Sequence, residues 1–107
     1  MPYIIVQTWH PTDIVTEVTE KYIEVMKEFP FDRSLGKETI SIAANTNKKG
    51  VEAMSVMEVK QGKLEEAWAW AGRRLAPFHS IKGFEYEIRL WSTVAEALEG
   101  SEYSLPE

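Results

Sequence analysis

The spacing of apolar residues changes several times along this 107-residue chain, and the order of the changes restricts what it can fold into. Four segments are predicted to be strands, at residues 3–9, 38–45, 51–60 and 84–91. Each shows either alternating apolar and polar residues or the β-branched and aromatic composition that is typical of strands. Segments with apolar residues at helical spacing follow the first and the third of them. The sequence therefore predicts the order strand, helix, strand, strand, helix, strand.

The first helix is predicted after Pro11-Thr12-Asp13 and before Pro30. Proline suits the first turn of a helix, and the side chain of Thr12 or Asp13 can cap free backbone amides. The residues at helical spacing that should face the core are Ile14, Val18, Tyr22, Val25, Met26 and Phe29.

The second helix carries an apolar stripe that should face the core, formed by Leu64, Ala67, Trp68, Ala71, Leu75 and Phe78. Trp70 lies about 100° or more from the centre of this stripe at 3.6 residues per turn, so it is predicted to cover a flank. Pro77 falls in the last turn, which predicts that the helix is distorted there or ends a residue or two earlier.

The middle strands are predicted to form a hairpin through residues 46–50 (TNKKG), because Asn and Gly tolerate the positive φ of tight turns. Simple alternation places Ile40, Ile42 and Ala44 on one face of the second strand. After the last strand, the pattern Thr93 to Glu96 (TVAE) is a capping box that opens a short helix.

The predicted order of elements is the split βαβ, ferredoxin-like order. Right-handed crossovers favour an antiparallel sheet in the order 4-1-3-2 with both helices on one face. We therefore predict an α+β class, ferredoxin-like fold, as a single domain over residues 1–107. Its parts are a core at 3–91, a terminal helix at about 93–99 and a tail at 100–107.

The charge and cysteine content exclude several classes of partner and site. The net charge is −5 and the sequence pI is about 5.1, so this acidic chain lacks the clustered basic face that nucleic acid or an anionic membrane needs. With no cysteine, disulfides, thiolate nucleophiles and zinc–thiolate sites are excluded. No signal-like leader or membrane-length apolar run is present, so we expect a cytoplasmic protein, and we expect no cofactor and no metal site.

Both faces of the first strand carry apolar bulk, with Tyr3, Ile5 and Trp9 on one side and Ile4 and Val6 on the other. The helices can cover only one face of the sheet. The other face would leave an apolar patch in water, which usually marks an interface. We therefore expect a homodimer, or a higher oligomer, in which a second copy covers this face.

By element order and length over residues 3–91, the chain resembles the dimeric α/β-barrel proteins. That group includes small cofactor-free monooxygenases, haem-degrading monooxygenases and muconolactone isomerase-like proteins. The resemblance implies a homodimer with a pocket, and a cofactor-free oxygenase or isomerase if the protein is an enzyme. For the haem-degrading members it also implies an amide, a tryptophan and a histidine in one site, which Gln7, Trp68 and His79 would supply here, with glutamine in place of asparagine.

The two histidines are the candidate catalytic residues. The split βαβ order places His10 and His79 at the same end of the molecule, where two imidazoles could act as an acid–base pair or as two metal ligands. The alternative, which the sequence favours, is that each is a partly exposed histidine at the end of an element.

The chain is rich in aromatic residues, which either build a core and an interface or line a pocket. We expect a pocket for a small, mostly apolar or aromatic molecule, lined by Gln7, Trp9, Tyr22, Trp68 and Phe78. The alternative is a non-catalytic oligomerisation or ligand-sensing module, in which the aromatics serve only the core and the interface.

Overall fold

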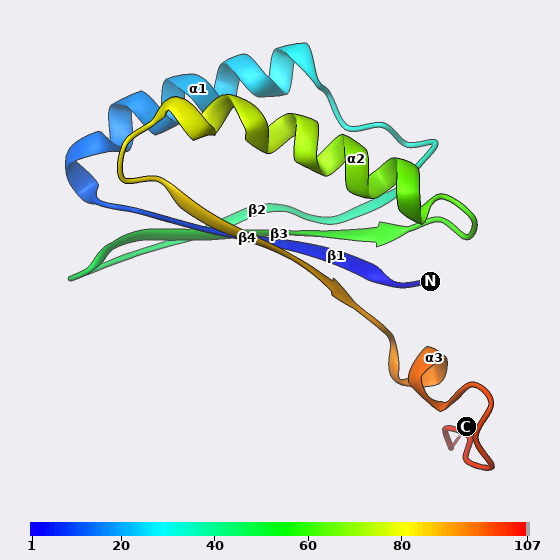
Figure 1. Ribbon diagram of the computed structural model, residues 1–107. Coiled ribbons are helices and arrows are strands. Elements are labelled where there is room, and N and C mark those ends of the chain that lie inside the picture. The colour runs from blue at the N-terminus through cyan, green and yellow to red at the C-terminus, as the bar shows by residue number, and fades with distance from the viewer. Residues whose placement is uncertain (107) are drawn as a thin grey trace.

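A computed structural model describes residues 1–106 (Figure 1). The strands are β1 Tyr3–His10, β2 Gly36–Asn47, β3 Gly50–Val59 and β4 Glu85–Trp91. The helices are α1 Val15–Glu28, α2 Leu64–Leu75 and the short α3 Val94–Leu98. Within the described residues, no helix combines the length and the apolar character needed to cross a membrane.

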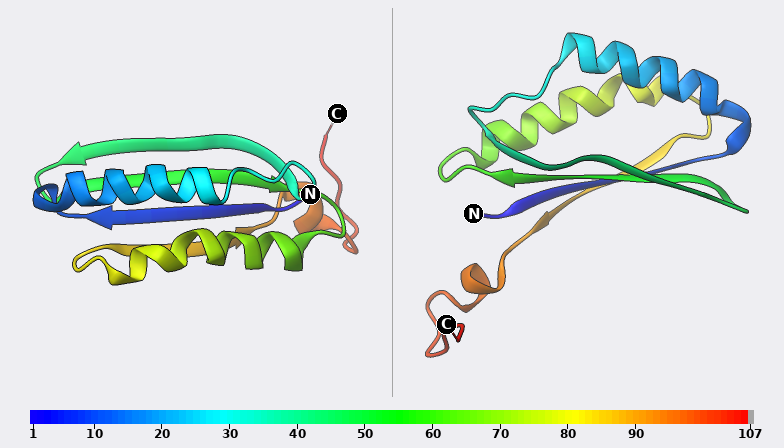
Figure 2. Two further views of the ribbon diagram at one scale, coloured as in Figure 1. Left: turned by 90° about the horizontal axis from the view of Figure 1, so that it is seen from above. Right: turned by 180° about the vertical axis from the view of Figure 1, so that it is seen from behind.

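The four strands form one antiparallel sheet in the order β2-β3-β1-β4, which is the predicted order read from the other edge. The helices α1 and α2 lie side by side on one face of this sheet (Figures 1 and 2). We call this the helix face and the opposite side the outer face. The α+β class, the order of elements and the sheet order are therefore confirmed.

The ends of the helices follow local sequence signals, with one exception. Pro11 itself takes the cap position of a 3₁₀ turn at Thr12–Ile14, and neither Thr12 nor Asp13 caps an amide through its side chain, so that prediction was wrong. The helix α2 ends at Leu75 and continues as a 3₁₀ turn with Pro77 near its start, as predicted.

The capping box at the start of α3 is confirmed. The backbone N–H of Thr93 donates to the Glu96 carboxylate at 2.9 Å. The backbone N–H of Glu96 donates to the Thr93 hydroxyl at 3.1 Å. This helix and the tail then extend away from the sheet on its outer side (Figures 1 and 2).

The prediction that Ile40, Ile42 and Ala44 share one face of β2 was wrong. Pairing with β3 shifts between Glu38 and Ile40 and again between Ile40 and Ala43. Ile40 therefore pairs with an outer-face residue of β3, whereas Ile42 and Ala44 border the space under the helices. Irregular pairing of this kind changes which face a side chain occupies, and strict alternation does not anticipate it.

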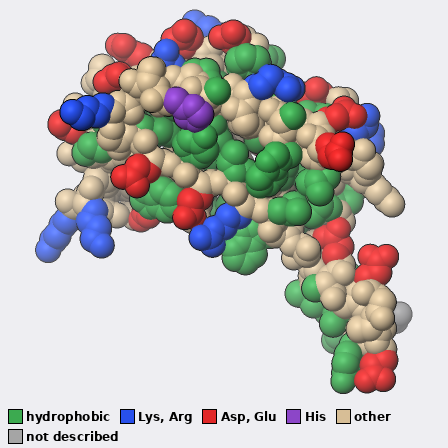
Figure 3. Space-filling view, viewed as in Figure 1, with side chains coloured by type: hydrophobic (Ala, Val, Ile, Leu, Met, Phe, Trp, Pro, Cys, Tyr) green, Lys and Arg blue, Asp and Glu red, His purple; other side chains and the backbone are tan. Residues whose placement is uncertain are grey.

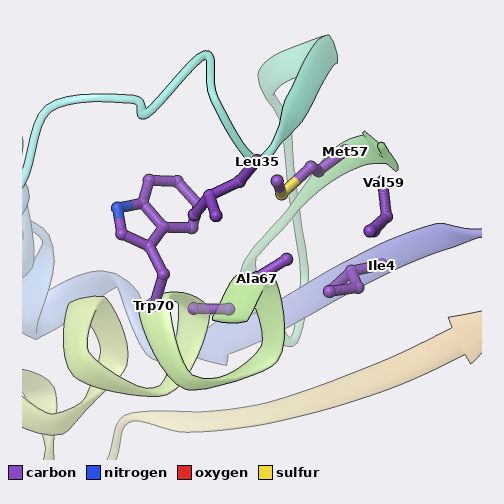
Figure 4. Packing of buried hydrophobic residues seen from close by; sticks show 7 residues of the cluster. Ile4, Leu35, Met57, Val59, Ala67 and Trp70 are labelled. Atoms are coloured by element: carbon purple, nitrogen blue, oxygen red, sulfur yellow. The ribbon is translucent and has the colours of Figure 1, made fainter. Parts of the chain in front are cut away.

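The buried core falls into two clusters, at opposite ends of the space between helices and sheet. The first joins β1, β3 and α2 and comprises Ile4, Leu35, Met57, Val59, Ala67, Trp70 and Ala71 (Figure 4). The second joins α1 to the segment after α2 and comprises Val18, Val25, Phe78 and Ile81.

The two tryptophans of α2 have exchanged their predicted roles. Trp70 is 8% exposed and packs edge-on against Phe31 at 5.4 Å between ring centroids, whereas Trp68 is 42% exposed. The buried residues of α2 are Ala67, Trp70, Ala71 and Leu75. Relative to the predicted stripe, the buried face is therefore rotated towards Trp70 and away from Trp68. Small residues let the helix approach the sheet closely, and the connector that carries Phe31 covers Trp70.

Candidate functional site

A cavity of about 390 Å³ lies between the helices and the sheet. Its floor consists of inward-facing residues of the two central strands, including Thr8 of β1 with Ala53 and Ser55 of β3. Its roof includes Val18 of α1 and Ala71 of α2. Because small side chains occupy the middle of the floor, the helices leave a space there instead of a continuous core.

The cavity separates the two core clusters. Its lining takes Ile4, Met57 and Trp70 from the first cluster and Val18 and Phe78 from the second. Each end of the space is therefore held by packed apolar side chains. This volume lies in the range of about 300–1,000 Å³ that is usual for small-molecule pockets.

The cavity opens between α1 and β2. The lining residues that are exposed at this opening are Thr12 and Thr19 on the α1 side and Ser41, Ile42, Ala44 and Thr46 on β2. The helices lie mainly over the other three strands, which leaves this side of β2 uncovered (Figure 2). A small molecule could therefore enter without unfolding of the core.

His10, the last residue of β1, lines this cavity and is 8% exposed. Its ring stacks on Phe84 at 6.1 Å between centroids, and its Nδ1 atom has no hydrogen-bond partner within residues 1–106. Burial lowers the pKa of His10, because the charged imidazolium loses its hydration. The neutral ring can therefore exchange a hydrogen bond or a proton with a molecule in the cavity.

Arg74 of α2 also lines the cavity and is half-buried. Its guanidinium lies 4.6 Å from the centre of the Trp70 ring, and one NH2 group points at the sulfur of Met26. Burial lowers the pKa of Arg74, although the negative charge of Glu38 opposes this effect. Across the described part of the chain, no carboxylate forms an ion pair with Arg74.

Sequence reasoning missed Arg74. The signal was present, since residues 67, 70, 71, 74 and 78 follow the i, i+3, i+4, i+7 spacing of one helix face. The predicted stripe included Trp68 and excluded Trp70, which left Arg74 outside it. In the folded protein the buried face of α2 includes Trp70 and not Trp68, so Arg74 lies on the buried side.

Of the five predicted pocket residues, Tyr22 and Phe78 line the cavity. Gln7 and Trp9 do not, because alternation along β1 turns them to the outer face, where they border a separate hollow. Trp68 faces away from the cavity and lies beside Leu90 on the outside of α2. The predicted set is therefore divided among three places.

The two histidines lie at the same end of the molecule but do not face each other. The imidazole of His79 is exposed, and its Nε2 atom lies 2.6 Å from the Tyr86 hydroxyl, with the two rings stacked. Phe84 stands between this pair and His10, with ring centroids 6.4 Å from Tyr86 and 6.1 Å from His10. Only His10 reaches the cavity, so the geometry does not form a histidine pair.

The amide, tryptophan and histidine implied by the haem-degrading resemblance are also not assembled. Gln7 is on the outer face of the sheet, Trp68 on the outside of α2, and His79 at the surface beside Tyr86. Three side chains in three separate surroundings cannot act on one bound molecule. Within residues 1–106, no group of three or more His, Asp or Glu side chains could hold a metal ion.

Comparison with known proteins supports the fold and nothing beyond it. No protein-family model matches the chain, and neither does any curated protein sequence. A solved structure that is similar in fold is "De novo designed protein Foldit4", with a TM-score of 0.52 and 14% sequence identity. The match covers 86% of this chain and 96% of the designed chain. At that identity the similarity concerns the arrangement of helices and strands alone.

Proposed function

We propose that the protein binds a small, mostly apolar molecule in the cavity between its helices and sheet. The single observation that carries this proposal is a space of about 390 Å³, largely apolar, with the buried imidazole of His10 in its wall. Apolar walls with a few placed polar groups are the usual features of a ligand site. Filling such a space would also join the two core clusters.

If the bound molecule reacts, His10 is the residue in position to move a proton. Its buried, neutral imidazole suits a general base, whereas His79 is held by Tyr86 outside the cavity. A cofactor-free oxygenase or isomerase would fit this arrangement. A non-catalytic ligand sensor needs only the cavity, and turnover assays on a bound ligand would separate the two.

Filling the floor of the cavity is expected to abolish most ligand binding. The probe is N-phenyl-1-naphthylamine, a neutral molecule whose fluorescence rises in apolar surroundings. In the variant Ala53→Leu, the added side chain occupies the cavity, so we expect the affinity for the probe to fall about 10-fold or more. Fluorescence titration gives the affinity, and a thermal melt shows that the variant is folded.

The matched control is Ala43→Leu, which adds the same atoms to the outer face of the neighbouring strand β2. It should keep the affinity of the parent protein. Absence of saturable probe binding by the parent protein, or equal affinity in Ala53→Leu, would rule out the cavity as a ligand site.

A second proposal concerns the outer face of the sheet, which we infer is covered by another copy of the chain. Ile5 and Val56 pair at the centre of this face, with Trp9 and Trp91 towards its ends. The segment after β4 projects on the same side with exposed apolar residues, among them Tyr103 (Figure 3). Val56 is already buried within one copy, but Trp91 and Tyr103 are each more than half exposed, and face-to-face pairing would cover them. Membership of the dimeric α/β-barrel group is part of this proposal.

The oligomeric state tests this second proposal. Size-exclusion chromatography with light scattering should give twice the 12.3 kDa mass of one chain at micromolar concentration. Ile5→Lys places a charge in the centre of the outer face and should shift the mass to that of a monomer. The control Leu90→Lys changes an exposed residue on the helix side of β4 and should leave the dimer intact. A monomeric parent protein would contradict the proposal.

A further inference from the structure

We propose that the ligand is a monocarboxylate with an apolar body, and that its carboxylate pairs with Arg74 while the body fills the cavity. This inference rests on the proposed function, because it names the chemical class that the same cavity would select. It is carried by the surroundings of Arg74, by the polarity of the rest of the lining and by the position of His10.

The guanidinium of Arg74 lacks partners that match its charge. Its five N–H donors have a sulfur atom of Met26 and the face of Trp70 beside them, and Nε is buried with no acceptor within residues 1–106. A thioether is a weak acceptor, and a cation that is partly removed from water without a strong partner is costly. An anion in the cavity would remove that cost.

The nearby carboxylate of Glu38 does not fill this role. Its charge acts on Arg74 from β2, but the two side chains form no ion pair. By contrast, the exposed Arg89 is paired with Glu87 at 3.1 Å. Arg33 and Arg73 also form no ion pair within residues 1–106, but both are exposed to water, whereas Arg74 is half-buried and borders the cavity. A planar ligand carboxylate can accept two parallel N–H bonds from a guanidinium, which is the strongest geometry for such a pair.

The remaining lining favours one negative charge and an otherwise apolar molecule. Around the floor and roof, side chains such as Val6, Val18 and Phe78 offer no charge, and the Ser, Thr and Tyr side chains of the lining, among them Thr8 and Ser55, offer only hydroxyl groups. His10 is buried and neutral, so it does not supply a second cation. A dicarboxylate would leave one of its charges unpaired among these groups, which the cost of burying a charge opposes.

Arg74 and His10 lie in different parts of the cavity. Arg74 lies one residue before the end of α2 and Phe78 lies in the 3₁₀ turn that follows, so the two are about 7–8 Å apart along the axis at the rises of the two helix types. Phe78 stacks on Phe84 at 4.7 Å, and Phe84 in turn stacks on His10 at 6.1 Å. A ligand held by its carboxylate at Arg74 would therefore extend along these rings towards the imidazole of His10. This places a polar or reactive group at the far end of the ligand next to His10.

The test compares naphthalene-2-carboxylate with naphthalene-2-carboxamide, which have the same apolar body and differ in charge. Each displaces N-phenyl-1-naphthylamine in a fluorescence competition. The parent protein should bind the carboxylate about 10-fold or more tightly than the amide, because hydrogen bonds to charged groups are strong. In Arg74→Gln that ratio should fall to about 1, while affinity for the neutral probe is kept.

Arg73→Gln is the matched control, since it removes an exposed arginine from the adjacent position of α2 and should keep the ratio of the parent protein. Arg74→Lys retains the positive charge but not the planar guanidinium, so it should keep part of the preference for the carboxylate over the amide. That result would show that Arg74→Gln lost the preference because it lost the charge, and not because it misfolded. Thermal melts accompany each variant.

Equal affinity for carboxylate and amide in the parent protein would overturn the carboxylate assignment and leave the proposed pocket standing. A preference for the carboxylate over the amide that survives in Arg74→Gln would also overturn the carboxylate assignment. Failure of the neutral probe and of both naphthalene compounds to bind the parent protein would overturn the pocket itself, and this inference with it.

Discussion

Replacing Trp70 with alanine is expected to lower the free energy of unfolding by about 3–5 kcal/mol, the usual cost of removing a buried aromatic side chain. Trp70 is 8% exposed, packs edge-on against Phe31 and carries the guanidinium of Arg74 on its ring. It also lies in the core cluster with Ile4 and Leu35 (Figure 4), and it lines the cavity. Its removal would enlarge a space that is already present, so the surrounding structure has little opportunity to compensate.

Chemical unfolding by urea, followed by circular dichroism, measures this loss as a shift of the midpoint. The control is Trp68→Ala on the same helix. Trp68 is 42% exposed and borders only a shallow surface hollow with Leu64 and Leu90, so we expect a loss of about 1 kcal/mol or less. A larger loss for Trp68→Ala than for Trp70→Ala would mean that α2 is rotated as the sequence pattern predicted.

Gly36→Ala is expected to destabilise the protein by about 3 kcal/mol, near the upper part of the usual range for overpacking. Gly36 begins β2 and pairs with Val59 at the edge of the sheet. A methyl group at this position would overlap the carbonyl oxygen of Glu58 and press on the backbone nitrogen of Lys60. Both are backbone atoms, so no side-chain rotation relieves the clash, and the start of the β2–β3 pairing must separate.

The matched control is Gly72→Ala in the interior of α2. A methyl group at Gly72 would meet no other atom within 4 Å, and alanine is the better helix former. We therefore expect a gain of about 0.5–1 kcal/mol, opposite in sign to the effect at Gly36. Thermal and urea unfolding should show that the free energy of unfolding falls in Gly36→Ala and rises in Gly72→Ala. Equal effects of the two substitutions would contradict the close approach of Glu58 to Gly36.

The order of elements was predictable because its signals are local. Periodicity marks each strand and helix, Pro30 and Pro77 mark where helices end or distort, and the box at Thr93 and Glu96 marks the start of α3. The sheet order follows from that sequence of elements, because right-handed crossovers leave few alternatives.

The candidate site was less predictable, since it depends on which faces meet. Trp9 and Gln7 are aromatic and polar residues on a central strand, but alternation places them on the outer face once the helices cover His10 and Thr8. The sequence pattern shows that Trp9 and Gln7 lie on one face of β1 and that His10 and Thr8 lie on the other. It does not show which of these two faces the helices cover.

The sequence by itself determined the elements, their order and the sheet, since short-range periodicity and chain chirality suffice for these features. Only the tertiary structure decided the rotation of α2, the irregular pairing of β2 and the place of the cavity. Each of these depends on contacts between distant segments: Phe31 covers Trp70, β3 shifts its pairing after Glu38, and the register between β1 and β3 brings Thr8 beside Ala53. The cavity with Arg74 in its wall results from all of these contacts together, so no single segment of the sequence predicts it.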